Sequence, residues 1–226
     1  MQVKKKKNME QELNAIRAGV LGSNDGILTV VGVLFSVAAA TNNQFTILIA
    51  GLADLFACAF SMASGEYASV SSQSDTEKAA VENARRDLKN NYQQQLVLVQ
   101  NYYVDKGVTQ QTALAIAQEL MVKNPLKILV NVKYDIELDE YMNPWEAAFA
   151  SLFSAGLGGI FPLLAMTFLP TNLKFVGTII VTAFAVGLTG YLSAKLGKGL
   201  VKKAIIRNII IGLITIAIHY GIGQLF

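Results

Sequence analysis

Four ionisable side chains lie inside stretches of the sequence that are otherwise apolar: Asp25, Asp54, Glu66 and His219. Placing a carboxylate near the centre of a bilayer costs about 2.5–3.5 kcal/mol on insertion scales, so such groups usually face a cavity, a partner or a transported ion. We therefore predict that Asp25, Asp54 and Glu66 form an ion site. Two structural interpretations stay open: Asp25 caps a helix break, or Glu66 lies at the water interface.

The second apolar stretch carries sulfur as well as carboxylate. Asp54, Cys58 and Met62 follow one another at intervals of four residues, which in a helix places them along one side over about 12 Å. Magnesium and calcium prefer oxygen ligands, whereas a thioether beside carboxylates favours a softer first-row metal such as ferrous iron. Met62 is a candidate to join Asp25, Asp54 and Glu66 in a metal translocation pathway, although packing is the more common role of methionine in a membrane helix. Packing is the alternative role for Met62, and for Cys58 it is the one we favour.

Gly22 and Gly26 surround Asp25 in a G-x-x-x-G pattern, which permits the close approach of another helix. We predict this pair at the interface of a homodimer, where two copies would double the carboxylates and supply the several oxygens that a divalent cation needs. His219 is the only histidine. It is either a proton relay or a neutral imidazole hydrogen-bonded within a helix bundle, and we favour the second state.

The composition requires lipid around these stretches. The chain has 226 residues, 53% hydrophobic and 15% charged, and a mean hydropathy of +0.41, which is too apolar for one soluble core. The net charge of +3 is small, and basic residues beside apolar stretches argue against nucleic-acid binding. A single cysteine excludes an intrachain disulfide and a cysteine zinc cluster within one chain. We expect no permanently bound cofactor and no enzymatic activity, because no nucleophile elbow or H-E-x-x-H helix occurs.

Five apolar segments approach the ~20 residues with which a helix crosses hydrocarbon. We predict an all-α polytopic membrane protein with five transmembrane helices and a cytoplasmic helical insertion between the second and third. The predicted divisions are a basic amino terminus (1–17), spans one and two (18–40 and 45–70), the insertion (71–146) and spans three to five (147–169, 175–194 and 204–225).

Basic residues gather at the ends of these segments that belong to one side of a membrane. Lys4 to Lys7 and Arg17 precede the first segment, and five more lie between the fourth and fifth: Lys195, Lys198, Lys202, Lys203 and Arg207. Because basic loops face the cytoplasm, we expect the amino terminus and the insertion inside and the carboxyl terminus outside. Asn24 and Asp25 argue against a cleaved signal peptide, so we expect a retained first helix. We expect the membrane to be a bacterial plasma membrane.

The insertion reads as helical. We predict one helix from about Asp75 towards Asp105 with Gly107 as its stop, a second capped by Thr109, and a third opened by Asn124 and Pro125.

These motifs resemble those of the vacuolar iron transporter family, over nearly the full chain. The resemblance is carried by Gly22-Ser-Asn-Asp25-Gly26, by Ala50-Gly-Leu-Ala-Asp54, by Ser61-Met62-Ala-Ser-Gly65-Glu66-Tyr67 and by Asn143-Pro144-Trp145. It implies a homodimer that exports ferrous iron, and often manganese, from the cytosol in exchange for protons, along a pathway at the dimer interface. The family lines that pathway with two acids and a methionine, and Asp25, Asp54 and Met62 stand at those places. The second acid is commonly glutamate in relatives.

The insertion departs from the family pattern. Relatives carry a series of glutamates there that collect metal, but the stretch from Ala84 to Leu98 is almost free of acid here. Asp87 and Glu137 are the candidates for surviving cytoplasmic metal ligands, with Asp135, Asp139 and Glu140 as nearby carboxylates. The insertion serves dimerisation or gating in the alternative interpretation. The competing function is a non-transporting scaffold or regulatory subunit whose insertion binds a protein partner.

Overall fold

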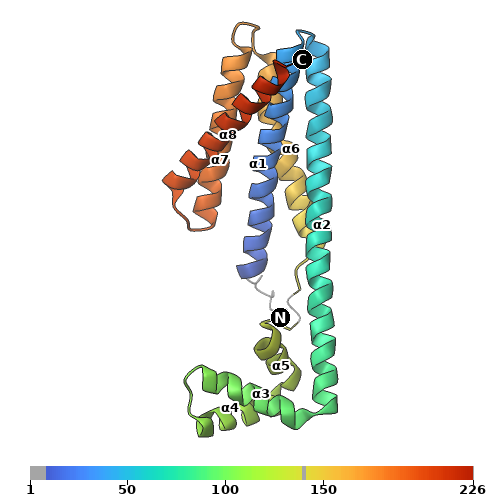
Figure 1. The fold of residues 1–226 in the computed structure, drawn as a ribbon, viewed down its shortest axis with the longest axis vertical. Coiled ribbons are helices and arrows are strands. Elements are labelled where there is room, and N and C mark those ends of the chain that lie inside the picture. The colour runs from blue at the N-terminus through green and yellow to red at the C-terminus, as the bar shows by residue number, and fades with distance from the viewer. Residues whose placement is uncertain (1–8, 139–140, 226) are drawn as a thin grey trace, which may run out of the picture. The chain divides into compact units, whose positions relative to one another are not determined.

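The computed structural model describes residues 9–138 and 141–225, with side chains from residue 13 onwards. The lysine run at 4–7 and the acids Asp139 and Glu140 lie outside the described residues. The described chain forms eight α-helices and no strand (Figure 1): α1 (Met9–Ala40), α2 (Gln44–Asn90), α3 (Tyr92–Asp105), α4 (Gln110–Lys123), α5 (Pro125–Tyr134), α6 (Pro144–Phe168), α7 (Lys174–Leu196) and α8 (Val201–Gly223).

Five of these helices are long and apolar enough to cross a membrane: α1, α2, α6, α7 and α8. The prediction of an all-α chain with five spans is therefore confirmed. The chain divides into two compact units. Unit 1 comprises Met1–Ser69 and Asn143–Phe226, and unit 2 comprises Val70–Met142.

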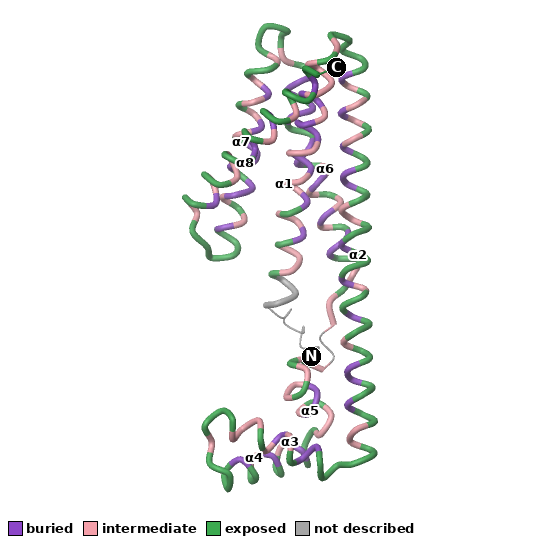
Figure 2. The backbone as a smooth tube through the Cα atoms, viewed as in Figure 1, coloured by how far each residue is buried: buried purple, intermediate pink, exposed green. Residues whose placement is uncertain are grey.

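In unit 1, α1 packs against α6, α7 and α8. Its buried face joins side chains from α2, α6 and α8 in one apolar cluster: Val30, Val31, Leu34, Phe35, Ile47, Leu55, Leu163, Met166 and Ile216. Figure 2 shows buried and exposed residues alternating along α2, so one side of this helix faces the cluster and another faces the surroundings.

The contact between α1 and α6 depends on glycines. A Cβ atom added to Gly26 would lie 2.1 Å from the carbonyl oxygen of Ala155, and one added to Gly158 would lie 2.3 Å from that of Ser23. A Cβ atom on Gly22 would lie within 2.9 Å of Ser151 and Ser154. The two backbones are thus in direct contact, as small residues permit.

This packing corrects our prediction for Gly22 and Gly26. Both glycines are buried against α6 of the same chain, so the prediction that they lie at a homodimer interface is wrong. A G-x-x-x-G pattern reports that some helix approaches closely, and the pattern does not identify the helix.

Unit 2 has two small apolar cores. Val81, Ala84, Leu129 and Val130 form one, and Leu96, Val99, Ala117 and Met121 form the other. Thr109 caps α4 by accepting a hydrogen bond from the Thr112 amide, and Pro125 opens α5, as predicted.

The predicted helix from Asp75 to Asp105 is two helices in the structure. α2 ends at Asn90, and Asn91 leaves the helical conformation, with φ −154° and ψ 80°. Its side chain accepts a hydrogen bond from the Gln94 amide and so caps α3. An asparagine that can satisfy the free amides of a new helix end stabilises this break.

The glycine contact gives a prediction for stability. We expect Gly26→Ala to lower the melting temperature and the folded yield in detergent, because the new methyl group would overlap the α6 backbone. Gly19→Ala is the matched control on the same helix, since a Cβ atom there meets nothing within 4 Å; it should be neutral or slightly stabilising. Fluorescence-detected size exclusion after heating measures both. Equal melting temperatures would show that α1 and α6 do not pack this way.

Candidate functional site

The polar side chains of α1 and α2 face one another in an antiparallel register. Cys58 donates a weak hydrogen bond to Asp25 Oδ2 at 3.8 Å, and Arg17 pairs with Glu66. Eight residues separate the two groups on each helix, so the contacts recur after two turns. The structure thereby brings Asp25 of the first span beside the polar series of the second span, which consists of Asp54, Cys58, Met62 and Glu66.

Asp54 stands one turn from Cys58 along α2. Thr29 of α1 lies beside its carboxylate, and Asp25 and His219 are within electrostatic range. Asp54 Oδ2 and Thr29 Oγ1 are both buried, and neither makes a hydrogen bond with any described residue. Unsatisfied oxygens in an apolar setting are costly. These two oxygens are therefore available to a proton or a cation.

Cys58 and Met62 extend the series towards Glu66. Cys58 is buried in an apolar cluster with Ala59 and Ala155, and Met62 packs against that cluster. Our packing interpretation of Cys58 describes most of its contacts, but its sulfur also touches the Asp25 carboxylate. Met62 lies between Cys58 and Glu66 along the helix, so its thioether stands between the two carboxylate levels.

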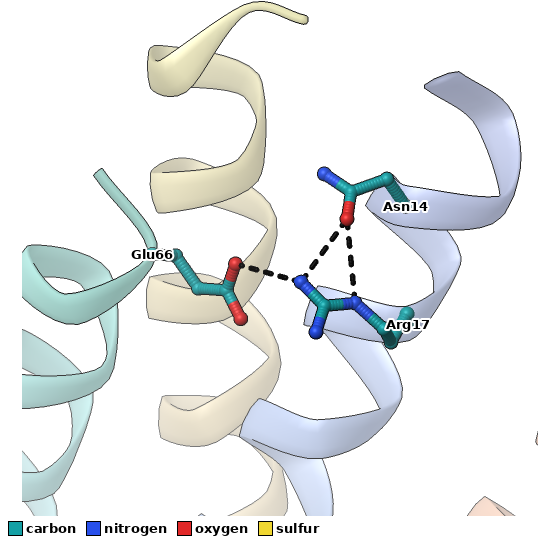
Figure 3. Close-up of polar contacts among 3 residues, drawn as sticks. All are labelled: Asn14, Arg17 and Glu66. Atoms are coloured by element: carbon teal, nitrogen blue, oxygen red, sulfur yellow. Dashed lines mark hydrogen bonds and ion pairs between the residues drawn. The ribbon is translucent and has the colours of Figure 1, made fainter. Parts of the chain in front are cut away.

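Glu66 lies inside unit 1, with its side chain only 8% exposed. Its carboxylate is therefore covered by protein, and the interpretation that Glu66 stands at the water interface stays open because its partner Arg17 is 61% exposed. Its partner is the Arg17 guanidinium, with 3.5 Å between Nη2 and Oε2. Figure 3 shows this pair together with Asn14, whose Oδ1 accepts hydrogen bonds from the same guanidinium.

His219 of α8 packs against the carboxyl-terminal part of α1, where Gly32 and Ser36 lie. A Cβ atom on Gly32 would meet its ring at 2.9 Å, and its Nδ1 lies 3.4 Å from Ser36 Oγ. The Ser36 hydroxyl also donates to the His219 carbonyl oxygen at 2.8 Å. These contacts agree with an imidazole held within the bundle, and the proton relay stays a prediction.

The described side chains of one chain do not form a complete metal site. Among the side chains that the structure describes, no three His, Cys, Asp or Glu groups come close enough to hold a metal ion together. Asp25 and Cys58 form a pair, and Asp54 lies one turn away. Divalent cations take several ligands, more than this pair alone supplies.

The sequence as a whole matches known proteins over nearly its entire length. Residues 16–224 match the sequence model of the VIT family. The chain belongs to the VIT family. It is 35% identical over 211 residues to a vacuolar iron transporter of Acanthamoeba castellanii, covering 93% of this chain and 78% of that protein. It is 30% identical to vacuolar iron transporter homolog 1 of Oryza sativa (93% and 73% covered) and 29% identical to vacuolar iron transporter homolog 3 of Arabidopsis thaliana (93% and 82% covered).

Unit 2 of this VIT-family chain contains Asp87 and Glu137, which we predicted as metal ligands of the insertion. The surroundings of these two residues differ from those of a metal site. Asp87 pairs with Lys133 of α5 at 2.5 Å, and this hydrogen bond raises the pKa of Lys133 above its ordinary value. Glu137 is exposed beyond the end of α5. Ala84 is fully buried in an apolar core. The structure does not bring Asp87 and Glu137 together in a metal-holding group of described residues.

Three residues that contact the predicted site residues escaped the sequence reasoning. Arg17 counted only as a marker of membrane topology, although it is the partner of Glu66. Thr29 and Ser36 have no charge and no motif, so nothing in the sequence distinguished them from other small polar residues of a membrane helix. Thr29 follows Asp25 by four residues, which places both on the same side of a helix. This spacing is the signal that could have identified Thr29.

The unsatisfied oxygen of Asp54 gives a prediction for stability. We expect Asp54→Leu to raise the melting temperature by about 2–4 °C, the shift that ~1 kcal/mol produces in a chain of this size, because the substitution removes a buried carboxylate oxygen without a partner. Asp75→Leu removes an exposed carboxylate from the same helix and is the control. Thermal unfolding in metal-free detergent solution measures both. A lower melting temperature for Asp54→Leu would mean that Asp54 is structural.

Proposed function

We propose that this chain moves ferrous iron, and also manganese, out of the cytoplasm in exchange for protons, along a pathway between two copies of the chain. The observation that carries the proposal is the half-buried Asp54 carboxylate, whose buried Oδ2 has no well-formed hydrogen bond, beside Thr29 and near Asp25 at one end of the polar series of α1 and α2. The vacuolar iron transporters among its relatives support the same cargo.

The ligand types favour a soft divalent metal. Asp25 and Asp54 supply hard oxygens, and Met62 supplies a thioether on the same side of α2. Oxygen alone would suit magnesium or calcium, whereas the mixed set suits ferrous iron and tolerates manganese. The metal is cargo here, so its binding must be reversible.

A second copy would complete the site. Only 28% of the most apolar stretch of α2 is buried within the chain, against 44% for α1 and for α6, 39% for α7 and 17% for α8. The helix that carries Asp54 and Met62 therefore keeps a large uncovered face. A two-fold contact through α2 would bring both sets of ligands together. Gly22 and Gly26 are excluded from this contact because they pack against α6.

Protons can neutralise the carboxylates of the site after the metal ion has left it. Two carboxylates that release a divalent cation can each take up one proton, so the emptied site carries no extra charge through lipid. Metal and protons thus compete for the same oxygens of Asp25 and Asp54. The basic residues at the amino end of α1 and between α7 and α8 favour a cytoplasmic location for these ends and the opposite side for the carboxyl terminus.

A second candidate function rests on unit 2. The pairing of Asp87 with Lys133 and the burial of Ala84 leave this unit poorly suited to collecting metal. A cavity of about 640 Å³, lined by residues such as Gln95, Asn101 and Tyr102, opens beside the Asp87–Lys133 pair. A scaffold or regulatory subunit would use such a surface for a protein partner.

Metal flux tests the proposal. In proteoliposomes with an imposed pH gradient, we expect the wild-type chain to move ferrous iron and Asp54→Ala to move none, because a carboxylate of the pathway is lost. Asp75→Ala, on the exposed part of the same helix, should transport normally. Flux in Asp54→Ala equal to that of wild type would remove Asp54 from the mechanism. A wild-type chain without metal-dependent flux under any gradient would favour the scaffold.

The thioether gives a separate prediction. Met62→Leu keeps the volume of the side chain but removes the sulfur, so we expect it to slow ferrous iron more than manganese, which prefers oxygen. Met166→Leu is the matched control, because Met166 is buried in the apolar core of unit 1. The iron-to-manganese ratio of initial rates measures the effect. An unchanged ratio in Met62→Leu would assign Met62 to packing.

A further inference from the structure

Glu66 is the last member of the polar series on α2. Asp54, Cys58, Met62 and Glu66 follow at four-residue intervals, which spans about 18 Å of helix. Glu66 pairs with a residue near the start of α1, at the end of unit 1 where the basic residues gather. It is thus the carboxylate that a cation from the cytoplasm would meet first.

The two members of the Glu66–Arg17 pair differ greatly in their exposure to solvent. The carboxylate is 8% exposed, whereas the Arg17 side chain is 61% exposed. The distance of 3.5 Å between Nη2 and Oε2 is longer than the ~2.7–2.9 Å of a charge-assisted hydrogen bond. Glu66 Oε2 makes no hydrogen bond within the described part of the chain. Arg17 therefore supplies charge to Glu66 without being bonded tightly to it.

Asn14 holds the guanidinium in this place. Its Oδ1 accepts from Arg17 Nε at 3.3 Å and from Nη2 at 3.0 Å, as Figure 3 shows. Because Asn14 and Arg17 lie one turn apart on α1, the guanidinium keeps this support whether or not a carboxylate faces it. The long arginine side chain can also withdraw towards water while its stem stays on apolar surface.

A buried carboxylate that loses its counter-charge is strongly destabilised. Arg17 can therefore leave Glu66 only when another cation takes its place or when Glu66 is protonated. A divalent metal ion has twice the charge of the guanidinium and can approach the carboxylate more closely. The arrangement is one in which two cations, one tethered and one mobile, compete for a single carboxylate.

We propose that Arg17 is a tethered cation that occupies Glu66 at the cytoplasmic mouth of the pathway until an incoming divalent metal ion displaces it. Arg17 thereby sets the metal concentration at which transport begins. This inference rests on the proposed transport function and deepens it. A purely structural pair would instead join α1 to α2 and affect stability alone.

Initial rates of ferrous iron flux in proteoliposomes, measured against metal concentration, test the proposal. Arg17→Gln removes the competing charge and keeps an amide that can contact Asn14, so KM should fall about two- to fivefold, as expected for a partly exposed pair. Arg17→Lys keeps the charge and should keep KM near the wild-type value. Arg207→Gln removes an exposed charge from the start of α8, and it is the control for net charge.

Glu66→Gln supplies a second test, since it keeps the shape of the side chain and removes the contested charge. Its KM should rise, and adding Arg17→Gln to it should change KM no further. An unchanged KM in Glu66→Gln would overturn the proposal even if Arg17→Gln did not fold. So would a KM in Arg17→Gln equal to that of Arg207→Gln, or a loss of kcat alone. Absence of flux in the wild-type chain would reject the transport function itself.

Discussion

The direct backbone contact between α1 and α6 is the constraint on which the rest of unit 1 depends. Gly26 and Gly158 allow the two helices to approach until a carbonyl oxygen of each occupies the space of a missing side chain on the other. With that face of α1 fixed, the neighbouring residue Asp25 turns towards α2 and meets Cys58. The orientation of the whole polar series on α1, from Arg17 to Thr29, follows from this one contact.

The polar groups show the conflict between stability and function that is common at functional sites. Apolar side chains around Leu34 and Leu55 hold α1, α2 and α6 together, yet the same helices keep Asp54 and Thr29 with buried, unpaired oxygens. A sequence selected for stability alone would place leucine at position 54. The chain keeps a carboxylate there, and the surrounding packing tolerates it.

Hydropathy and helix length were enough to predict the five spans, because ~20 apolar residues in a row have few other uses. The location of Asp25 and Asp54 inside these helices could be predicted for the same reason, since charge inside such a stretch is conspicuous, whereas their role stays a prediction. The partner of Gly26 could not, because a glycine pattern does not say which helix it contacts. The Arg17–Glu66 pair and the break at Asn91 likewise depend on tertiary packing and capping, which local composition does not reveal.

The spacing of the carboxylates has a consequence for how many ions the chain can hold. Glu66 and the Asp25–Cys58 contact lie two helical turns apart, or about 12 Å. Two divalent cations at that separation repel each other by roughly 5–6 kcal/mol at an effective dielectric constant of about 20. Simultaneous filling of both levels is therefore strongly disfavoured. In the proposed pathway, the arrival of a second ion would push the first one onward, so that ions would advance in single file.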